Sequence, residues 1–406
     1  MTLEIYDTTL RDGSQQEGIS LTVGDKLRIA GLLDDLGVHY VEGGWPGANP
    51  KDDEFFQRAK SELDLSRATL VAFGSTRRPR GSVGDDAQLA ALLAAETSAI
   101  CIVGKSWDYH VREALRTDLD EGARMVGESI EYLRRHDRRV FFDSEHFFDG
   151  YRDNPEFALT TLRVALEAGA ERLVLCDTNG GTLPHDILST VAAVQQALPE
   201  AEVGVHFHND SGTAVASSLA AVRAGVRQVQ GCINGYGERT GNTDLSTLIP
   251  DLILKEGLPV LPDGHLELLG PISHHVAEVV NITLDPHRPY VGTSAFTHKA
   301  GLHTSALARK PDAYEHTNPS LVGNSTRMVV SELAGKASIA SKAAELNLDM
   351  NDELSQRVIE IIKEREHSGY HYEAADGSFE LLVRELAGWK QEFFELESFR
   401  VFTERR

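Results

Sequence analysis

Short apolar segments rich in β-branched residues alternate with longer amphipathic segments along the first 235 residues. The short segments start about 25–40 residues apart, the length of a strand, a helix and their connections. Eight such segments occur, at 3–8, 39–44, 68–74, 99–104, 139–145, 172–178, 203–208 and 228–234. Strands that alternate with helices form a parallel sheet, and eight strand–helix units close a barrel. The pattern therefore predicts a (β/α)8 barrel.

An open, doubly wound sheet is the structural alternative to the barrel. No GxGxxG sequence follows the first strand segment, and an open sheet needs no such regular repeat. The pattern ends near residue 258, where GLPVLPDG is typical of a linker. We predict a catalytic barrel over 1–258, a linker and first subdomain over 259–330, a helical second subdomain over 331–370 and a tail over 371–406.

Composition narrows the class of protein. The chain has 62 acidic and 40 basic side chains, a net charge of -22, which argues against binding to nucleic acid or anionic membranes. No apolar run approaches the roughly 20 residues of a membrane helix, and the N-terminus enters a strand pattern at once. Cys101, Cys176 and Cys232 lie in apolar segments without CxxC spacing, as buried free thiols do. We expect a cytoplasmic protein.

The carboxyl ends of the predicted strands are unusually polar. They read TTLRDGSQ, DSEH, CDTNGG, HFHND and NGYGERTGN after strands one, five, six, seven and eight. In (β/α)8 barrels the active site lies at this end of the strands. Polar residues at the strand ends are therefore functional candidates, whereas the apolar strand interiors form the core.

A divalent-metal site is the clearest candidate. His206 and His208 are two residues apart on one strand, so both imidazoles point to the same face. Asp12, at the end of strand one, completes a set of two histidines and one carboxylate. Two interpretations stay open for Asn242: it approaches the metal, or it caps the helix that begins near Thr243.

Three further strand-end residues each have a functional and a structural interpretation. Arg11 either stabilises an enolate or alkoxide oxygen or forms an ion pair with Asp12 or Glu42. Glu145 is a general acid or base, or it orients a metal-bound water. Thr178 donates its hydroxyl to a substrate carboxylate, or it serves the turn.

Two other groups at the strand ends have open interpretations. The glycines of NGYGERTGN do not follow the spacing of a nucleotide-binding loop. Arg77, Arg78 and Arg80 follow strand three and either hold an anionic substrate or form a solvated loop.

Three motifs in this order are distinctive of one enzyme family. YDTTLRDGSQQEG, VHFHND and NGYGERTGN together resemble the acyl-CoA-dependent, aldol-type enzymes that include isopropylmalate, homocitrate and citramalate synthases and HMG-CoA lyase. EGGWPGANPKD, FGSTRR, VGKSWD and GLHTSALARKPDAYEHTNPSLVGN look most like the bacterial citramalate synthases. The resemblance covers nearly the whole chain and implies a (β/α)8 barrel followed by small helical subdomains.

The resemblance also implies a reaction. In the family a divalent metal (Mn, Mg or Zn) chelates a 2-keto acid, a base removes a proton from acetyl-CoA, and the resulting enolate attacks the ketone. Thioester hydrolysis then makes the condensation irreversible. For this chain the implied acceptor is pyruvate and the products are (R)-citramalate and CoA, in isoleucine biosynthesis. The alternatives are an isopropylmalate or homocitrate synthase with another keto acid, or an aldol lyase like HMG-CoA lyase.

Site residues carry over position by position. Asp12, His206 and His208 match the family's metal ligands, and Arg11 matches its oxyanion-stabilising arginine. Glu145 and Thr178 match strand-end catalytic and substrate-binding positions.

Other positions carry over from the C-terminal region. His303 matches a histidine that assists enolisation and usually comes from the partner protomer, so we expect a homodimer with shared active sites. Tyr314 matches a tyrosine of the same subdomain. Several relatives carry an aspartate where this chain has Ser305.

Two expectations concern specificity and regulation. Trp45 and Phe73, at the ends of strands two and three, are large enough to exclude an acceptor bigger than pyruvate. The tail alternates like a strand from Phe394 but has no later segment to pair with. We therefore expect a longer natural protein that continues into a regulatory region, and a 406-residue form insensitive to isoleucine or leucine.

Overall fold

The computed structural model describes residues 3–299, 310, 314–389, 391 and 395–404. The chain forms two compact units. The first comprises Met1–Ala295 and Ser320–Asn324, and the second comprises Phe296–Pro319 and Ser325–Arg406.

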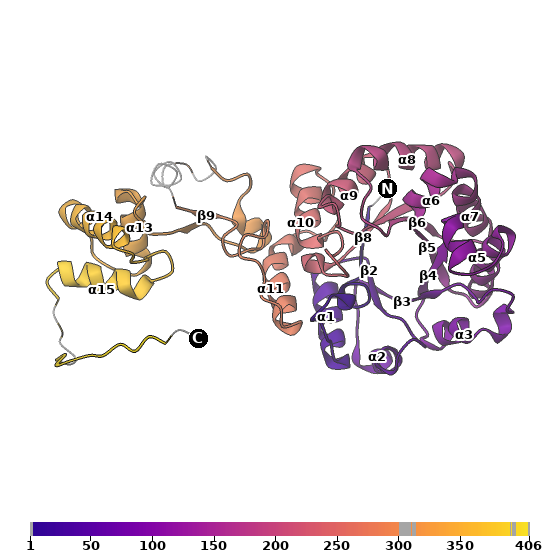
Figure 1. Cartoon of the computed structure of the whole chain (residues 1–406), viewed down its shortest axis with the longest axis horizontal. Helices are drawn as coiled ribbons and strands as arrows, with labels where there is room; N and C mark the ends of the chain where they lie inside the picture. Colours follow the sequence, from indigo (N-terminus) through magenta and orange to yellow (C-terminus); the bar gives the residue numbers. More distant parts are fainter. Residues whose placement is uncertain (1–2, 300–309, 311–313, 390, 392–394, 405–406) are drawn as a thin grey trace. The chain divides into compact units, whose positions relative to one another are not determined.

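Eight parallel strands of the first unit close into a barrel (Figure 1). They are β1 (Glu4–Asp7), β2 (Tyr40–Gly44), β3 (Thr69–Ser75), β4 (Ala99–Lys105), β5 (Arg139–Glu145), β6 (Arg172–Asp177), β7 (Val203–Phe207) and β8 (Gln228–Gly231). Each strand pairs with the next, and β1 pairs with β8, with Ile5 opposite Val229. The predicted (β/α)8 barrel is confirmed.

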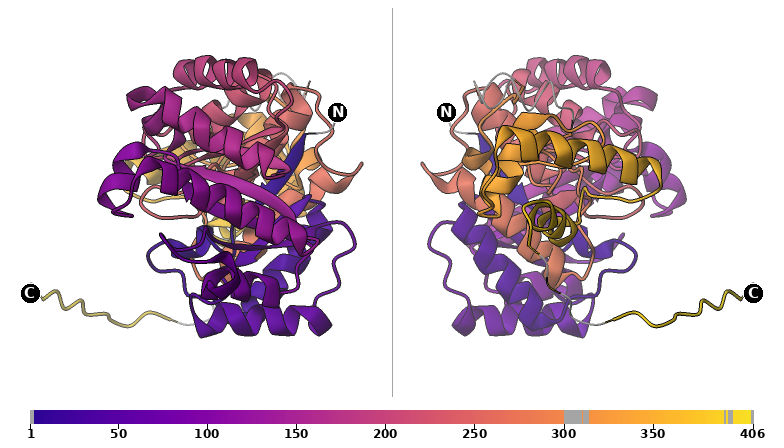
Figure 2. Two further views of the ribbon diagram at one scale, coloured as in Figure 1. Left: turned by 90° about the vertical axis from the view of Figure 1, so that its right-hand side faces the viewer. Right: turned by 90° about the vertical axis from the view of Figure 1, so that its left-hand side faces the viewer.

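Helices surround the barrel, and in Figure 2 (left) α5 and α7 lie side by side on its outside. The helices of this unit are α1 (Val23–Leu36), α2 (Pro50–Glu62), α3 (Ala87–Ala94), α4 (Asp108–Glu113), α5 (Leu119–Arg135), α6 (Phe147–Asp153), α7 (Pro155–Glu167), α8 (Pro184–Ala197), α9 (Ala214–Arg223), α10 (Leu245–Pro250) and α11 (Leu269–Val279). Local sequence sets their ends: Thr22 forms a capping box with Asp25 at the start of α1, and Gly37, at φ 95°, ends it.

The barrel interior is filled by side chains. Tyr6, Tyr40 and Phe141 pack there, with the ring centroids of Tyr40 and Phe141 5.1 Å apart. Glu42 and Asp143 come two residues further along β2 and β5, so they share this inward face but lie nearer the carboxyl ends of the strands. An apolar floor therefore supports a polar layer above it.

The first unit extends to Ala295, beyond the predicted barrel end at residue 258. The reason is α11, which packs on α1, while the carbonyl of Ser273 accepts a hydrogen bond from Asn234 Nδ2 at 2.9 Å. Helix α11 therefore belongs to the first unit, although it lies in the range predicted as linker and first subdomain. The finer subdomain boundaries remain predictions.

The second unit contains a two-stranded parallel sheet and three helices. Strand β9 (Thr297–His298) pairs with β10 (Arg327–Met328), and α13 (Lys336–Glu345), α14 (Asp352–His367) and α15 (Asp376–Leu386) follow. Ile339, Val358 and Phe379, one from each helix, lie in a shared core. Helices α13 and α14 lie within 331–370, which was predicted to be helical.

The predicted strand at the end of the chain is wrong for the residues that the structure describes. Residues 395–404 form neither helix nor strand, and Phe399, Val401 and Phe402 are at least 75% exposed. An alternating pattern alone does not make a strand, because the backbone donors and acceptors need a partner. No described helix is long and apolar enough to cross a membrane.

Candidate active site

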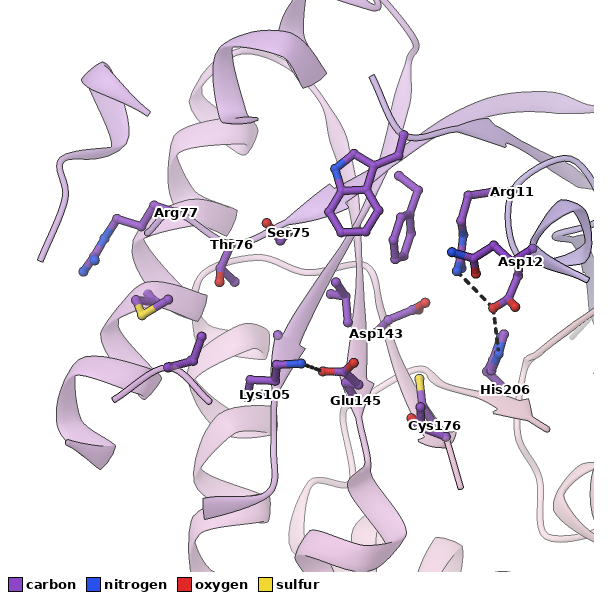
Figure 3. Close-up of a pocket in the computed structure, with 18 of the residues that line it drawn as sticks. Arg11, Asp12, Ser75, Thr76, Arg77, Lys105, Asp143, Glu145, Cys176 and His206 are labelled. Carbon is purple, nitrogen blue, oxygen red and sulfur yellow. Dashed lines mark hydrogen bonds and ion pairs between the residues drawn. The ribbon is translucent and has the colours of Figure 1, made fainter. Parts of the chain in front are cut away.

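A cavity of about 400 Å³ opens at the carboxyl ends of the barrel strands (Figure 3). Its walls come from several strand ends, as expected for a (β/α)8 active site. The residues singled out from the sequence that line it are Arg11, Asp12, Trp45, Phe73, Arg77, Arg78, Glu145, Thr178, His206 and His208.

Asp12, His206 and His208 meet at one side of this cavity. One ligand atom from each lies within 4.8 Å of the others, and all three side chains are buried. Asp12 Oδ2 is 3.5 Å from His206 Nε2 and 3.9 Å from His208 Nε2. The curvature of the barrel brings the end of β7 to the loop after β1, although about 195 residues separate them in sequence. Two imidazoles and a carboxylate are a donor set for a divalent metal.

The protonation states suit metal ligation. Burial, and then the neighbouring His206, lower the pKa of His208 to about 4, so its imidazole is neutral near pH 7. Burial alone would raise the pKa of Asp12, but Arg11 and the two imidazoles outweigh it and hold that pKa well below its ordinary value. A neutral imidazole and an ionised carboxylate are the forms that bind metal.

Asn242 lies beside Asp12 and does not cap a helix. Its Nδ2 donates to Asp12 Oδ1 at 3.2 Å and to the carbonyl of Tyr236 at 3.0 Å. Asp244 caps α10 instead, by accepting from the Ser246 amide, so the capping interpretation was wrong. Asn242 Oδ1 is buried without a hydrogen-bond partner among the described residues. A buried acceptor without a partner fits a cation placed next to it.

Arg11 forms both ion pairs that the sequence allowed. Its Nε lies 2.5 Å from Glu42 Oε2 and its NH1 3.0 Å from Asp12 Oδ2, and the guanidinium stacks 3.7 Å from the ring centroid of Phe73. Burial would lower the pKa of Arg11, but Glu42 and Asp12 outweigh it and raise that pKa. Its NH2 group has no partner among the described residues, so Arg11 is a fixed cation with donors to spare.

Glu145 and Thr178 lie on neighbouring strand ends. Glu145 forms an ion pair with Lys105 from the end of β4 (Figure 3). Thr178 Oγ1 accepts from the His146 amide at 2.9 Å, which leaves its hydroxyl proton free to donate. Asp177 accepts hydrogen bonds from the amide and the hydroxyl of Thr182 and so stabilises the turn after β6. The sequence had left open whether Thr178 serves this turn.

Two large side chains border the cavity above Arg11. The rings of Trp45 and Phe73 meet edge to face with centroids 5.1 Å apart. Trp45 Nε1 donates to Gln88 Oε1 at 2.5 Å, which fixes the indole. Both residues therefore reduce the volume of the cavity.

The arginines after β3 divide into two kinds. Arg77 is buried, with Nη1 2.7 Å from Glu121 and Nε 2.6 Å from Glu128, so it is a structural ion pair. Arg78 lines the cavity and is exposed to solvent. Both arginines line the cavity, so whether either holds an anionic substrate stays a prediction.

The residues expected from a partner protomer belong to the second unit. His303 lies outside the described residues. Tyr314 is described and is 46% exposed. Their roles stay predictions.

Sequence comparison places this arrangement in a family. The HMGL-like family matches residues 2–265, which hold all the strand-end residues named above. The chain belongs to the HMGL-like family. A homocitrate synthase post-HMGL domain-like region matches residues 290–369.

Members of the HMGL-like family include close relatives of this chain. It is 55% identical over 408 residues to an (R)-citramalate synthase of Streptomyces coelicolor and 51% identical over 404 residues to one of Aquifex aeolicus. These alignments cover 100% and 99% of this chain and 76% of each relative. The structure of an HMG-CoA lyase from Bacillus subtilis superposes with a TM-score of 0.59 at 20% identity, covering 70% of this chain and 95% of the lyase. The family assignment from the sequence motifs is confirmed.

Sequence reasoning missed several residues of the HMGL-like site. Lys105 ends β4, so the rule that selects polar strand ends could have found it. Gln230 lies within strand β8, where an inward-facing polar side chain has no local signature. Asp143 begins the polar end DSEH of strand five, but it was not singled out as a site residue. Glu42 was noted only as a partner for Arg11, and the structure shows it fully buried.

Proposed function

We propose that the chain catalyses the condensation of acetyl-CoA with pyruvate to give (R)-citramalate and CoA. It is an acyltransferase in which the acyl group becomes an alkyl group. One observation carries the proposal: (R)-citramalate synthases align with essentially the whole chain at 51–55% identity. The cavity at the strand ends supports the proposal, because it is lined by the residues that match the family's metal-binding, catalytic and substrate-binding positions in the first unit.

The residues around Asp12 suit a divalent metal such as Mn²⁺, Mg²⁺ or Zn²⁺. Asp12, His206 and His208 would hold it, with the partnerless Oδ1 of Asn242 beside them. Such an ion supplies a Lewis acid that polarises the ketone of the keto acid. The three side chains that would bind the ion are buried, so bulk water does not compete with them.

Three residues handle charge and orientation. The guanidinium of Arg11, held by Glu42, stabilises the negative oxygen that develops during attack. The free hydroxyl proton of Thr178 donates to the substrate carboxylate. Glu145, paired with Lys105, is the acid or base at the end of β5.

Enolisation of acetyl-CoA is assigned to His303, with Tyr314 contributed by the same subdomain, on the family resemblance. Both residues come from the partner protomer of a homodimer in this proposal, so each active site is shared. Trp45 and Phe73 restrict the acceptor to pyruvate by excluding a branched side chain.

The acceptor is tested by measuring CoA release with a thiol reagent. Acetyl-CoA is supplied with pyruvate, 2-ketoisovalerate or 2-ketoglutarate in turn. We expect the highest kcat/KM with pyruvate. A higher kcat/KM with 2-ketoisovalerate would support the isopropylmalate synthase alternative, and no release of free CoA with any of the keto acids would support the lyase alternative.

One variant sharpens this test. Trp45→Phe enlarges the cavity without moving Arg11, whereas a change at Phe73 removes the ring on which Arg11 stacks. Trp45→Phe should therefore raise kcat/KM for 2-ketoisovalerate relative to pyruvate while leaving turnover of pyruvate largely intact. An unchanged ratio would mean that Trp45 does not border the acceptor.

Metal dependence is tested separately. Excess chelator should abolish CoA release, and His208→Ala should reduce bound metal while circular dichroism shows an intact fold. Full activity in chelator would contradict the metal site.

A further inference from the structure

Gln230 is a fully buried polar residue inside the barrel, immediately beside the candidate metal site. It lies on β8 and pairs in register with His206 of β7, so the two side chains share the inner face. Its Oε1 lies 2.9 Å from His206 Nδ1, and its Nε2 donates to Asp143 Oδ1 at 3.0 Å. The second hydrogen bond crosses the barrel interior from β8 to β5.

Asp143 determines which way the Gln230 amide points. Asp143 Oδ1 accepts from Gln230 Nε2, so the NH2 group of the amide faces Asp143. The amide oxygen then faces His206 and can only accept. His206 must therefore carry its proton on Nδ1, which leaves the lone pair of Nε2 directed toward Asp12, 3.5 Å away. Asp143 is itself surrounded by Glu42 and Cys101, whose ligand atoms all lie within 4.8 Å of one another.

We propose that Gln230, oriented by Asp143, is a positioning residue that holds His206 in the tautomer able to bind a metal. A metal-binding histidine usually donates its second ring nitrogen to a fixed acceptor, and loss of that acceptor typically weakens metal affinity about 10–100-fold. The usual acceptors are a carboxylate, a carbonyl or water. Here the acceptor is the side-chain amide of Gln230, and the carboxylate of Asp143 on β5 fixes the orientation of that amide. The inference rests on the proposed metal site and adds residues that the sequence motifs do not contain.

The chain provides a matched control two residues away. Gln228 is on the same strand and is equally buried, but its Nε2 contacts Glu4 Oε2 at 3.3 Å and not His206. If Gln230 were only a packing residue, Gln228→Met and Gln230→Met would have similar effects on the site. If Gln230 positions His206, only Gln230→Met affects the imidazole.

The decisive measurement is the tautomer of His206 in metal-free protein. Long-range ¹H–¹⁵N NMR of histidine-labelled protein distinguishes the two neutral forms, and the His206 signal is assigned by its loss in His206→Asn. We expect the Nδ1–H form in the parent protein and in Gln228→Met, and a shift toward the Nε2–H form in Gln230→Met. An unchanged Nδ1–H form in Gln230→Met overturns the inference.

Metal affinity gives an independent readout. Titration with Mn²⁺ alone, followed by electron paramagnetic resonance, should show binding about 10–100-fold weaker in Gln230→Met than in Gln228→Met. Equal affinities in the two variants overturn the inference. Failure of the parent protein to bind Mn²⁺ would count against the metal site itself, and the tautomer, which needs no metal, would still decide the role of Gln230.

A second variant covers the case in which Gln230→Met does not fold. In Gln230→Glu the new carboxyl group, when protonated, donates to Asp143 and accepts from His206 as the amide does. We expect it to retain the Nδ1–H tautomer and Mn²⁺ affinity close to that of the parent. Loss of the Nδ1–H form in a folded Gln230→Glu protein would contradict the proposed role.

Discussion

Individual residues in the barrel interior hold charge where water is excluded, and each charge is paired. Arg11 lies between Glu42 and Asp12, and Tyr6 donates to the other oxygen of Glu42 at 2.7 Å. Burial raises the pKa of Glu42, although Arg11 opposes that rise. A buried cation keeps its position only when such partners are present, because an unpaired buried charge is costly.

We predict that Glu42→Gln weakens catalysis through Arg11. The amide can still accept one hydrogen bond but supplies no charge, so Arg11 is held less firmly. We expect kcat to fall about tenfold, less than the 10²–10³ typical of losing an oxyanion donor outright. Glu4→Gln is the matched control, because Glu4 pairs with Arg172 at 3.1 Å outside the cavity. Equal kcat values for the two variants would contradict the role of Glu42.

A second residue-scale prediction concerns pH. Burial raises the pKa of Asp7 from 3.8 to about 7, although Thr9 and the Ile233 amide donate to it. Between these values the folded chain binds more protons than the unfolded chain, so the free energy of unfolding falls as pH rises. The decline from this one group is at most about 1.4 kcal/mol per pH unit.

Asp7→Asn removes this titration. Urea unfolding across that pH window should therefore show a shallower decline of stability with rising pH in Asp7→Asn than in the parent. The variant is also less stable throughout, because an amide replaces one acceptor with a donor. The prediction concerns the slope, and identical slopes in the two proteins would refute it.

At the scale of elements, the loop between β8 and α10 shows how backbone geometry serves the site. Its glycines shape the turn that carries Asn242 to Asp12. Gly235, Gly237 and Gly241 all have positive φ, and a Cβ on Gly237 would lie 2.2 Å from Asn242 Nδ2. A Cβ on Gly241 would lie 2.0 Å from the carbonyl oxygen of Gly235. Only glycine fits these positions.

We predict that Gly237→Ala displaces Asn242 and weakens the metal site. Mn²⁺ affinity should fall about tenfold or more, because Asn242 would no longer hydrogen-bond to Asp12. Gly31→Ala is the control, since a Cβ there meets nothing within 4 Å and lies in helix α1. If Gly237→Ala binds Mn²⁺ as tightly as Gly31→Ala, the loop does not position Asn242 for the site.

At the scale of the whole molecule, the proposed chemistry is divided between the two units. The first unit holds the candidate metal ligands and Arg11, and the sequence range of the second includes His303 and Tyr314. In a symmetric dimer with shared sites, one protomer supplies the barrel and the other supplies the histidine.

Mixing two inactive proteins tests this division. Arg11→Ala and His303→Ala lack different halves of the site, so each hybrid dimer contains one complete site and one doubly damaged site. Random exchange makes half of the dimers hybrid, and about a quarter of the sites should then be intact. We expect recovery of about a quarter of parental activity. No recovery after verified subunit exchange would contradict shared active sites.

The sequence by itself determined the features that repeat locally. Strand and helix periodicity located all eight barrel strands, because side-chain spacing reflects the geometry of each element. The strand-end rule then selected Asp12, His206 and His208, because parallel strands direct their carboxyl ends to one face of a barrel. The family motifs supplied the chemistry.

Only the tertiary structure decided which polar side chains meet. Asn242 could equally have capped a helix, and its position beside Asp12 depends on three glycine conformations after β8. The hydrogen bonds from Gln230 to His206 and Asp143 join strands that are far apart in sequence, so no local pattern encodes them. The alternating tail, conversely, formed no strand, because pairing needs a second strand at the right place. Periodicity encodes elements, whereas closure and register of the barrel determine contacts across it.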